Sequence, residues 1–509
     1  MGGRRAFGYA SLALLAALVA ATAIRAVVAG LTGLTDDEAY YRLWALAPAP
    51  SYLDHPPMVA FMIAAGRFVA GDAPLGIRLF GVLTPLAGLL LLWRSAHLLF
   101  GPTVAHRAVL FALAMPLLAV GGVIITPDTP SVLFWGLAFW ALIELDASGN
   151  PNWWLAVGLA AGLGLLSKYT NLFVGAGLVL WLILSPTNRR WLRSWQLWVG
   201  GALAIVLALP VLAWNANHGW ASFAKQFGRV AQSEPITLRY LGEFIAGYIG
   251  LASPAIAVLG IAGCLRVSRL PPHARDGARA LLAAAVLPLI AYLLLHALHG
   301  RVQANWAAPV YPLLAVCAAV AAGGRGGRCV DAAAKEGTNG TDRPRGGHVV
   351  GWAAGSGLVL SLLLLFHAVH PLVLLPGSKD PTAQMRGWPE LAREVTAARQ
   401  AAGACWIATW SYATTGQLAF ALAPDTPVVQ LSERIRYAHL PAVDRALFDC
   451  PGLLVELERR AFPDALAARF ADVRAHGHLT RAYAGVPIAT YALYRLATPK
   501  GPVLSDGAP

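Results

Sequence analysis

The sequence predicts an α-helical polytopic membrane protein with about eleven transmembrane helices and a small C-terminal α/β domain outside the membrane. The chain of 509 residues is 57% hydrophobic and only 13% charged, and its mean hydropathy is +0.58. A soluble domain carries about 25% charged residues. Apolar runs of about 20 residues, long enough to cross the hydrocarbon core of a bilayer, recur between residues 7 and 371. We therefore expect a multi-span membrane domain over residues 1–371.

The expected spans begin on the inner side, after Arg4 and Arg5. They lie near residues 7–30, 76–97, 104–124, 129–145, 153–167, 170–185, 195–214, 241–265, 280–299, 304–322 and 349–371. With this topology the arginine-rich loops fall inside, as the positive-inside rule requires, except for the short loop near Asp146. A signal peptide is the alternative for the first span, but the apolar run is about twice as long as a usual signal sequence core.

After about residue 372 charged residues become frequent, and no apolar run exceeds a dozen residues. Helix-like and strand-like patterns then alternate, which predicts a small α/β domain over residues 372–509. The segments are 389–402, 405–410, 413–422, 427–431, 453–458 and 463–470. Cys405 and Cys450 fall in this domain, where a disulfide is chemically allowed but not required by their spacing.

The formal net charge of +13 does not indicate nucleic-acid binding. The basic residues are scattered between hydrophobic spans and form no continuous stripe with aromatic residues. The glycine-rich segment Gly323–Arg328 lies in an inner loop, reads as a linker and has no supporting context for a nucleotide site. Membrane lipids are the surroundings that this composition predicts.

A cluster of acids follows the first span. Asp36, Asp37 and Glu38 are consecutive, and Asp54-His55 comes just before a double proline. A carboxylate at the edge of a bilayer loses hydration, so such a cluster needs a cation, a metal ion or a reaction to explain it. The alternatives are structural: the first acids could open a surface helix, where the helix dipole favours them, and Asp54 could cap the next helix.

The predicted topology places further polar residues on the same outer side as these acids. They are Asp128, Lys168, His218, Arg229 and Arg301. Each has a plain alternative: Asp128 could cap a helix, and His218 could belong to an interfacial aromatic belt. Lys168 and Arg301, each at the end of a span, could reach the lipid headgroups. Their convergence on one side indicates a functional site.

These residues carry a family resemblance, because six motifs occur in a fixed order. The motifs are Asp37-Glu38, Tyr52-Leu53-Asp54-His55-Pro56-Pro57, Thr126-Pro127-Asp128, Leu166-Ser167-Lys168-Tyr169-Thr170, Trp214-Asn215 with His218-Gly219-Trp220, and Arg301-Val302-Gln303-Ala304-Asn305-Trp306. In this order they resemble the bacterial C-type (GT-C) glycosyltransferases. The chain is most similar to the branch that includes the lipid A aminoarabinose transferases and the dolichyl-phosphate-mannose protein mannosyltransferase-like proteins.

The resemblance implies a GT-C-like enzyme of the bacterial inner membrane that takes a sugar from a polyprenyl-phosphate carrier on the periplasmic side. The acceptor would be lipid A, the lipopolysaccharide core or another envelope lipid or glycan. An acid of the first outer loop is essential in the family, and the Asp-Glu motif places that role on Asp37. The aminoarabinose transferases have Glu-Lys where this chain has Asp54-His55, which leaves the sugar, the acceptor and any metal open.

The chemistry of such a transfer fits the residue types. The leaving group is a phosphate ester, so the reaction needs positive charge near the phosphate, and Lys168, Arg301 and Arg229 are the candidates. A carboxylate must take the proton from an acceptor hydroxyl or stabilise positive charge at the anomeric carbon. We expect Asp37 in this role, with Glu38 and Asp128 as the other catalytic candidates.

The remaining polar residues are expected to bind substrate. Asp54, His55, Asp128 and His218 could hold a divalent metal ion, with Asp54 and His218 as its main ligands, or they could hydrogen-bond the sugar hydroxyls. No spacing fixes a metal, so no cofactor is assigned. Asn305 and Trp306 complete the expected substrate contacts.

Two alternative functions remain open from the sequence. The first is a protein O-mannosyltransferase-like enzyme, which the resemblance also covers. The second is a transporter or flippase, because charges bordering many spans can also form a substrate pathway. Transporters, however, place charges near the middle of the bilayer and often contain inverted repeats, and the sequence shows neither feature.

Overall fold

The computed structural model describes residues 2–231, 235–269, 272–323, 347–375 and 379–504. The chain groups into two compact units, each assembled from segments that are far apart in the sequence. The first unit comprises Met1–Val27, His55–Val59 and Phe80–Leu365, and the second comprises Val28–Asp54, Ala60–Leu79 and Phe366–Pro509.

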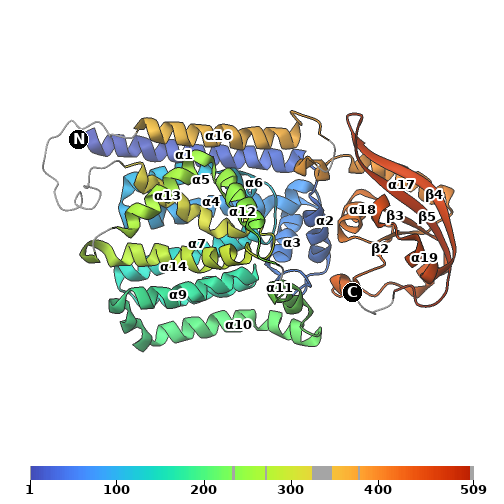
Figure 1. Cartoon of the computed structure of the whole chain (residues 1–509), viewed down its shortest axis with the longest axis horizontal. Helices are drawn as coiled ribbons and strands as arrows, with labels where there is room; N and C mark the ends of the chain where they lie inside the picture. The colour runs from blue at the N-terminus through green and yellow to red at the C-terminus, as the bar shows by residue number, and fades with distance from the viewer. Residues whose placement is uncertain (1, 232–234, 270–271, 324–346, 376–378, 505–509) are drawn as a thin grey trace. The chain divides into compact units, whose positions relative to one another are not determined.

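The first unit is helical, and its long helices run in nearly the same direction (Figure 1). Its α-helices are α1 (Gly2–Leu31), α4 (Pro74–Phe100), α5 (Pro102–Ala114), α6 (Pro116–Val120), α7 (Asp128–Ser148), α8 (Trp153–Leu165), α9 (Leu172–Leu184), α10 (Trp195–Asn217), α11 (Ala221–Ala231), α12 (Leu238–Ala252), α13 (Pro254–Ser268), α14 (Pro272–His296), α15 (Tyr311–Ala321) and α16 (Gly347–Val369). Three short 3-10 helices join them: η1 (Tyr169–Asn171), η2 (Pro186–Arg193) and η3 (Ala304–Val310).

Small residues allow the helices of this unit to pack closely. Helix α8 packs against α10, and α13 packs against α15. A Cβ atom on Gly158 would lie 2.1 Å from the carbonyl oxygen of Gly200, and one on Gly200 would lie 2.4 Å from that of Trp154, so both positions require glycine. Such close backbone approach is typical of helices that associate in a membrane, where van der Waals packing rather than hydrophobic burial stabilises the contact.

The protein is a multi-pass membrane protein, but the expected count of eleven spans is not confirmed. Among the described residues seven helices are long and apolar enough to cross a bilayer, or nine if each of two bent pairs counts as one span. The expected span 241–265 is one of these pairs, with α12 and α13 bent by 103°. The break falls at Ser253, whose φ is 69°, and at Pro254, which has no backbone N–H to continue the helix.

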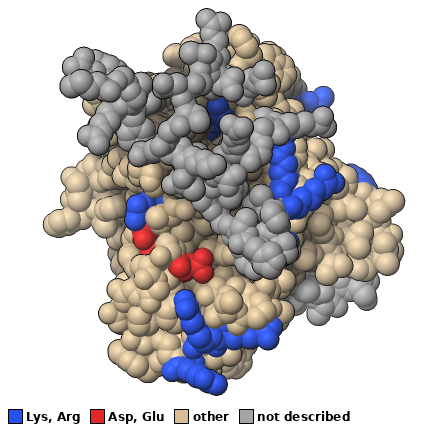
Figure 2. Space-filling model, turned by 90° about the vertical axis from the view of Figure 1, so that its left-hand side faces the viewer, with Lys and Arg blue, Asp and Glu red and all other residues tan. Residues whose placement is uncertain are grey.

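Basic side chains gather at one end of the first unit. Figure 2 looks at the left-hand side of Figure 1, and Lys and Arg outnumber Asp and Glu on the described part of that face. The connection between α9 and α10, which carries Arg189, Arg190 and Arg193, lies at this end in Figure 1. The loop expected to hold Arg325 to Arg345 lies outside the described residues.

The second unit combines the segment after the first helix with the C-terminal domain. Its first elements are α2 (Asp36–Leu46), α3 (Met58–Ala70) and the start of α4. The later helices are η4 (Pro381–Met385), α17 (Trp388–Ala401), α18 (Tyr412–Ala421), η5 (Arg434–Tyr437), η6 (Arg445–Asp449), η7 (Glu458–Arg460) and α19 (Pro463–Arg469). The strands are β1 (Trp406–Thr409), β2 (Val428–Gln430), β3 (Gly452–Leu457), β4 (Phe470–Tyr483) and β5 (Val486–Pro499).

The five strands form one sheet in the order β2-β1-β3-β5-β4. Strands β1, β2 and β3 are parallel, and β5 pairs antiparallel with both β3 and β4. The predicted α/β character of this region is therefore confirmed, whereas the long β4–β5 hairpin was not predicted. A disulfide joins Cys405 to Cys450, with 5.9 Å between the Cα atoms, and so links the segments that enter β1 and β3.

Candidate active site

The acidic segment of the second unit begins helix α2, and a capping box fixes its first turn. The side chain of Thr35 accepts a hydrogen bond from the backbone N–H of Glu38 at 3.2 Å. Glu38 Oε2 in turn accepts from the backbone N–H of Thr35 at 2.9 Å. This reciprocal pair satisfies two backbone donors that a helix start leaves free. The turn therefore holds Asp36 and Asp37 in a defined position.

Glu38 is buried and binds a buried arginine. Both side chains are 0% exposed, and Arg78 Nε and Nη2 donate to the two carboxylate oxygens at 2.7 and 2.6 Å. Arg78 also donates to the carbonyl oxygens of Ala29, Thr32 and Gly33 at 2.7 to 3.0 Å. With its charge neutralised and its oxygens engaged, Glu38 supports the fold of this segment.

Asp37 differs from its neighbour because its side chain reaches solvent, although protein crowds its carboxylate, and because it has no ion pair with a lysine or arginine of the described chain. Tyr412 Oη, from the first turn of α18, donates a hydrogen bond to Asp37 Oδ1 at 3.2 Å. Desolvation by the surrounding protein, followed by the charges of Asp36, Asp54 and Glu38, raises the pKa of Asp37 to about 6, against the opposing effect of the Tyr412 hydrogen bond. A carboxylate with this pKa suits a general base near neutral pH.

Asp54 is held by partners from α2 and η5. Tyr40 Oη donates to Asp54 Oδ2 at 3.0 Å, and Arg436 Nη1 forms an ion pair with the same oxygen. Arg436 also binds both carboxylate oxygens of Glu433, at 2.8 and 3.1 Å. Burial opposes the charge of Arg436, but its bonds to Glu433 and the nearby Tyr40 and Asp54 outweigh burial and raise the pKa of this guanidinium. Asp54 is therefore paired with a permanent cation.

Aromatic rings surround this ion pair. The guanidinium carbon of Arg436 lies 5.0 Å from the ring centroid of Tyr412 and 5.7 Å from that of Tyr40. The two tyrosine rings are 4.9 Å apart. Burial, followed by the charge of Asp37, raises the pKa of Tyr412, so its hydroxyl remains a hydrogen-bond donor at neutral pH. The carboxylates Asp37 and Asp54 thus share one cluster but have different partners.

Helix α18 reaches this cluster because glycine lets it approach α2. A Cβ atom on Gly416 would lie 2.7 Å from the backbone nitrogen of Tyr40. Gln417 Nε2 donates to the Leu34 carbonyl at 2.9 Å and to Asp36 Oδ1 at 3.0 Å. Burial raises the pKa of Asp36, and the hydrogen bond from Gln417 opposes that shift. Two sequence segments nearly four hundred residues apart therefore form one site within the second unit.

A second polar cluster lies in the first unit, at the start of α7. Lys168 Nζ lies 2.6 Å from Asp128 Oδ1, and Asn305 Nδ2 donates to Asp128 Oδ2 at 3.0 Å. The side chain of Asp128 does not cap the helix, since the N-cap position is Pro127 and makes no side-chain cap bond. Lys168 is 13% exposed and does not extend freely towards lipid headgroups. These three side chains therefore bind one another, and neither helix capping by Asp128 nor free extension of Lys168 describes their contacts.

The double-proline segment approaches the same helix end that presents Lys168. The backbone N–H of Met58 donates to the carbonyl oxygen of Leu166 at 2.9 Å. Both residues belong to the first unit, as does His55, which is half-buried. The motifs around His55 and Lys168 are therefore brought together by a backbone hydrogen bond.

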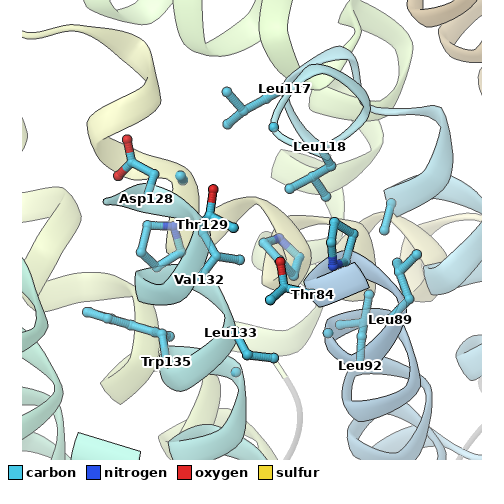
Figure 3. Close-up of a pocket in the computed structure, with 18 of the residues that line it drawn as sticks. Thr84, Leu89, Leu92, Leu117, Leu118, Asp128, Thr129, Val132, Leu133 and Trp135 are labelled. Atoms are coloured by element: carbon cyan, nitrogen blue, oxygen red, sulfur yellow. The ribbon is translucent and has the colours of Figure 1, made fainter. Parts of the chain in front are cut away.

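An apolar cavity of about 310 Å³ opens beside Asp128. Figure 3 shows Asp128 and Thr129 at one side of it, with Leu89, Leu118 and Leu133 among the residues facing the cavity from α4, α6 and α7. Asn305 and Trp135 also line it. Since most of its wall is hydrocarbon, the cavity suits an apolar chain with a polar end near Asp128.

The other predicted site residues have different surroundings. The side chain of Arg301 is 76% exposed, and its Nε atom lies 3.2 Å from Glu243 Oε2. His218 stacks on Trp214, with 4.1 Å between ring centroids, and its Nδ1 contacts the Trp214 carbonyl oxygen. The ring centroids of Trp306 and His296 are 6.0 Å apart. The side chain of Arg229 lies outside the described part of the chain.

The residues expected to bind a metal ion do not fit one. Among the described residues no group of three or more His, Cys, Asp or Glu side chains is arranged to hold a metal. Asp54 is paired with Arg436, and Asp128 is paired with Lys168 and Asn305.

Three residues that shape the acidic cluster were not expected from the sequence. Arg78 and Arg436 neutralise Glu38 and Asp54 across 40 and 382 residues of sequence. Tyr412 of the C-terminal domain contacts Asp37, although the sequence assigned it no role. The only available signal was that buried carboxylates require cations, which does not say which arginine supplies the charge.

Comparison with known proteins places this geometry in a known fold. Residues 54–214 match the family described as dolichyl-phosphate-mannose-protein mannosyltransferase. The chain is 30% identical over 277 residues to lipid A galacturonosyltransferase RgtD of Rhizobium johnstonii, a match that covers 54% of this chain and 58% of that protein. The chain therefore matches little more than half the length of this relative.

Solved structures resemble nearly the whole chain. The crystal structure of ArnT from Cupriavidus metallidurans bound to undecaprenyl phosphate has a TM-score of 0.63 at 16% identity, covering 94% of this chain and 97% of that one. The oligosaccharyltransferase AglB of Archaeoglobus fulgidus has a TM-score of 0.51 at 12% identity, covering 87% and 69%. The predicted GT-C architecture is confirmed at the level of the fold.

Proposed function

We propose that this chain, a multi-pass membrane protein with the GT-C fold, is a glycosyltransferase that moves a sugar from a polyprenyl-phosphate carrier to a lipid or glycan of the cell envelope. The observation that carries this proposal is the contrast between Asp37 and Asp54. Asp37 is exposed and has a raised pKa, whereas Asp54 is paired with Arg436. Carboxylates in one cluster with such different surroundings are suited to different catalytic tasks.

Asp37 is the general base in this proposal. Its carboxylate takes the proton from an acceptor hydroxyl as that oxygen attacks the anomeric carbon of the sugar. The bond between the anomeric carbon and the phosphate oxygen breaks, and the polyprenyl phosphate leaves as an anion. The hydroxyl of Tyr412, 3.2 Å from Asp37 Oδ1, holds the carboxylate in position. Glu38, with its charge opposed by Arg78, positions this turn and does not take the proton.

The leaving phosphate requires positive charge, and the residues predicted for it are Lys168, Arg301 and Arg229, of which the structure describes the side chains of the first two. Lys168 is 13% exposed, and its ammonium group is held by Asp128, whose other carboxylate oxygen accepts a hydrogen bond from Asn305 Nδ2. Arg301 is exposed and can change its partner from Glu243 to a phosphate at little cost. Lys168, held by Asp128, is a preorganised cation of the kind that stabilises charge developing in the transition state.

The named relatives support an envelope acceptor. RgtD is described as a lipid A galacturonosyltransferase, and the ArnT structure contains undecaprenyl phosphate. On this basis we propose a polyprenyl-phosphate donor and an acceptor of the lipid A or lipopolysaccharide class. The decisive experiment is mass spectrometry of envelope lipids from a strain that lacks the gene. A missing hexose, pentose or uronic acid supports the proposal, and unchanged lipids and glycans contradict it.

A second acceptor class is supported by the family match over residues 54–214, whose description names protein mannosyl transfer. A protein hydroxyl would need the same base at Asp37. Glycoproteomics of the deletion strain distinguishes a protein acceptor from a lipid acceptor. If the acceptor is a protein, it loses an O-linked sugar while the envelope lipids stay unchanged.

We further propose that the membrane part ends near residue 371 and that Asp37 and the C-terminal domain face the periplasm. The Cys405–Cys450 disulfide supports this, since disulfides persist in oxidising compartments. The positive-inside rule assigns the basic end of the first unit to the inner side of the membrane, which agrees with this proposed orientation. A phosphatase reporter after Pro499 should be active, and a cysteine at the exposed position Pro48, just after α2, should react with an impermeant maleimide. Reporters after Arg190 and Arg328 should indicate the inner side.

A further inference from the structure

Arg25 is a buried arginine in α1 that lines the apolar cavity beside Asp128. Its side chain is only 3% exposed, so it does not extend to solvent or to headgroups. Within the described chain its guanidinium makes one hydrogen bond, from Nη2 to the carbonyl oxygen of Leu118 at 3.3 Å. It forms no ion pair with any described carboxylate. A buried cation with a single neutral partner is unfavourable unless an anion joins it.

The surroundings of Arg25 provide space for its guanidinium and leave polar groups available. A Cβ atom on Gly122 would lie 2.7 Å from Arg25 Nε, so glycine is required there for the side chain to lie as it does. Thr84, which also lines the cavity (Figure 3), has a buried Oγ1 without a hydrogen-bond partner among the described residues. Asp128, the acid in the lining, is already neutralised by Lys168.

Most of the remaining lining is hydrocarbon, although Ser95, Thr126, Thr129 and Asn305 also contribute to it. Leucine, valine and aromatic side chains from α4, α6 and α7 form the hydrocarbon part, including Leu89, Leu118, Val132 and Phe139. A ligand for this cavity therefore needs one anionic group for Arg25 and a long apolar body for the remaining wall. A lipid that carries a phosphate has both features, and a water-soluble anion has only the first.

We propose that the cavity binds a phosphate-bearing lipid, with its hydrocarbon chain along the apolar wall and its phosphate on Arg25. Two sources share this chemistry: a polyprenyl phosphate and an anionic phospholipid of the surrounding bilayer. The polyprenyl source rests on the proposed function, because it would make Arg25 a binding residue for the sugar donor. The phospholipid source does not depend on glycosyl transfer at all.

The test compares lipid binding and thermal stability of purified, delipidated wild type, Arg25→Met and Arg239→Met. Arg239 is the control, because it is 77% exposed and does not line the cavity. Each protein is titrated with undecaprenyl phosphate, with uncharged undecaprenol and with phosphatidylglycerol. We expect a lipid phosphate to raise the Tm of the wild type and of Arg239→Met. Arg25→Met should bind it about ten- to a hundredfold more weakly, as expected for a lost charge-assisted hydrogen bond.

The lipid-free protein provides the second measurement. Since Met removes a buried charge that lacks an anionic partner, the Tm of lipid-free Arg25→Met should be no lower than that of wild type. A lower lipid-free Tm with unchanged lipid affinity would show that Arg25 is purely structural and would overturn the proposal. If Tm and affinity both fall, Arg25→Lys decides: restored affinity supports the phosphate role, and continued loss rejects it.

The three lipids separate the sources. A response to undecaprenyl phosphate alone identifies the polyprenyl carrier, whereas an equal response to phosphatidylglycerol identifies a bilayer lipid. An equal response to undecaprenol, unaffected by Arg25→Met, means that only the hydrocarbon chain is recognised and overturns the proposal. None of these readouts requires sugar transfer, so failure here is distinguishable from failure of the proposed catalytic function.

Discussion

Tyr412 Oη donates a hydrogen bond to Asp37 Oδ1 at 3.2 Å, so a residue of the C-terminal sequence contacts the proposed general base near the N-terminus. The hydrogen bond favours the ionised carboxylate and thereby lowers the pKa of Asp37, while desolvation and neighbouring acids raise it to about 6. The pKa of Asp37 therefore results from opposing effects, and single substitutions should be able to raise it or lower it.

Tyr412→Phe should move the acidic limb of the pH–rate profile to higher pH. The substitution removes a hydrogen bond that stabilises the ionised form, so the pKa of Asp37 rises and less base is available at a given pH. The measurement is kcat/KM for sugar transfer across about pH 5 to 8. Tyr494→Phe, in β5, is the control and should leave the limb in place. An unchanged limb in Tyr412→Phe would mean that Asp37 does not titrate in catalysis.

Asp36→Asn should move the same limb to lower pH. The charge of Asp36 raises the pKa of Asp37, so a neutral side chain at position 36 lowers it. The Asn oxygen can still accept the hydrogen bond that Gln417 Nε2 donates at 3.0 Å, which keeps the local structure. A shift in the direction opposite to that of Tyr412→Phe, measured with the same substrates, is the expected result. A shift in the same direction would contradict the electrostatic account.

Glu38→Gln should destabilise the protein far more than a surface substitution. It leaves the buried Arg78 without its carboxylate, which typically costs about 3–5 kcal/mol. The control is Glu243→Gln, whose partners Arg239 and Arg301 are 77% and 76% exposed, and it should cost less than about 1 kcal/mol. Thermal unfolding in one detergent compares the two. If both substitutions lowered the stability by an equally small amount, the Glu38–Arg78 pair would not stabilise the start of α2.

Lys168→Met and Arg301→Met should each reduce sugar transfer by about a hundredfold or more if these residues stabilise charge on the leaving phosphate. Lys168 also pairs with Asp128 at 2.6 Å, so the Tm of purified Lys168→Met is measured to check that this variant folds. Transfer within about twofold of wild type would assign either residue a purely structural or interfacial role.

The sequence predicted those features that depend on local pattern. Hydrophobic runs gave the helical membrane part, and alternating patterns gave the strands β1 to β3. The break at Ser253 was missed because the apolar run continues through it, although Pro254 was a visible signal. The β4–β5 hairpin was missed because residues 470–499 alternate only weakly between buried and exposed positions.

The site was predictable in its residue types but not in its pairings. The acids around Asp37 were singled out from sequence, as were Asp128 and Lys168 individually, and the structure brings the last two to 2.6 Å. The partners Arg78 and Arg436 were not foreseeable, because each pair forms only when distant segments fold together. Arg25 was hidden for a similar reason, since a single arginine inside an apolar run gives no sign of a cavity.

The most direct test of the central claim is the activity of purified Asp37→Asn with a polyprenyl-phosphate-linked sugar and a lipid A acceptor. Asn keeps the shape of the side chain and removes its charge and basicity, so we expect sugar transfer to be abolished while expression, membrane insertion and Tm stay close to wild type. Full transfer by correctly folded Asp37→Asn would contradict the account and would move the search for the base to Asp36, Asp54 or Asp128.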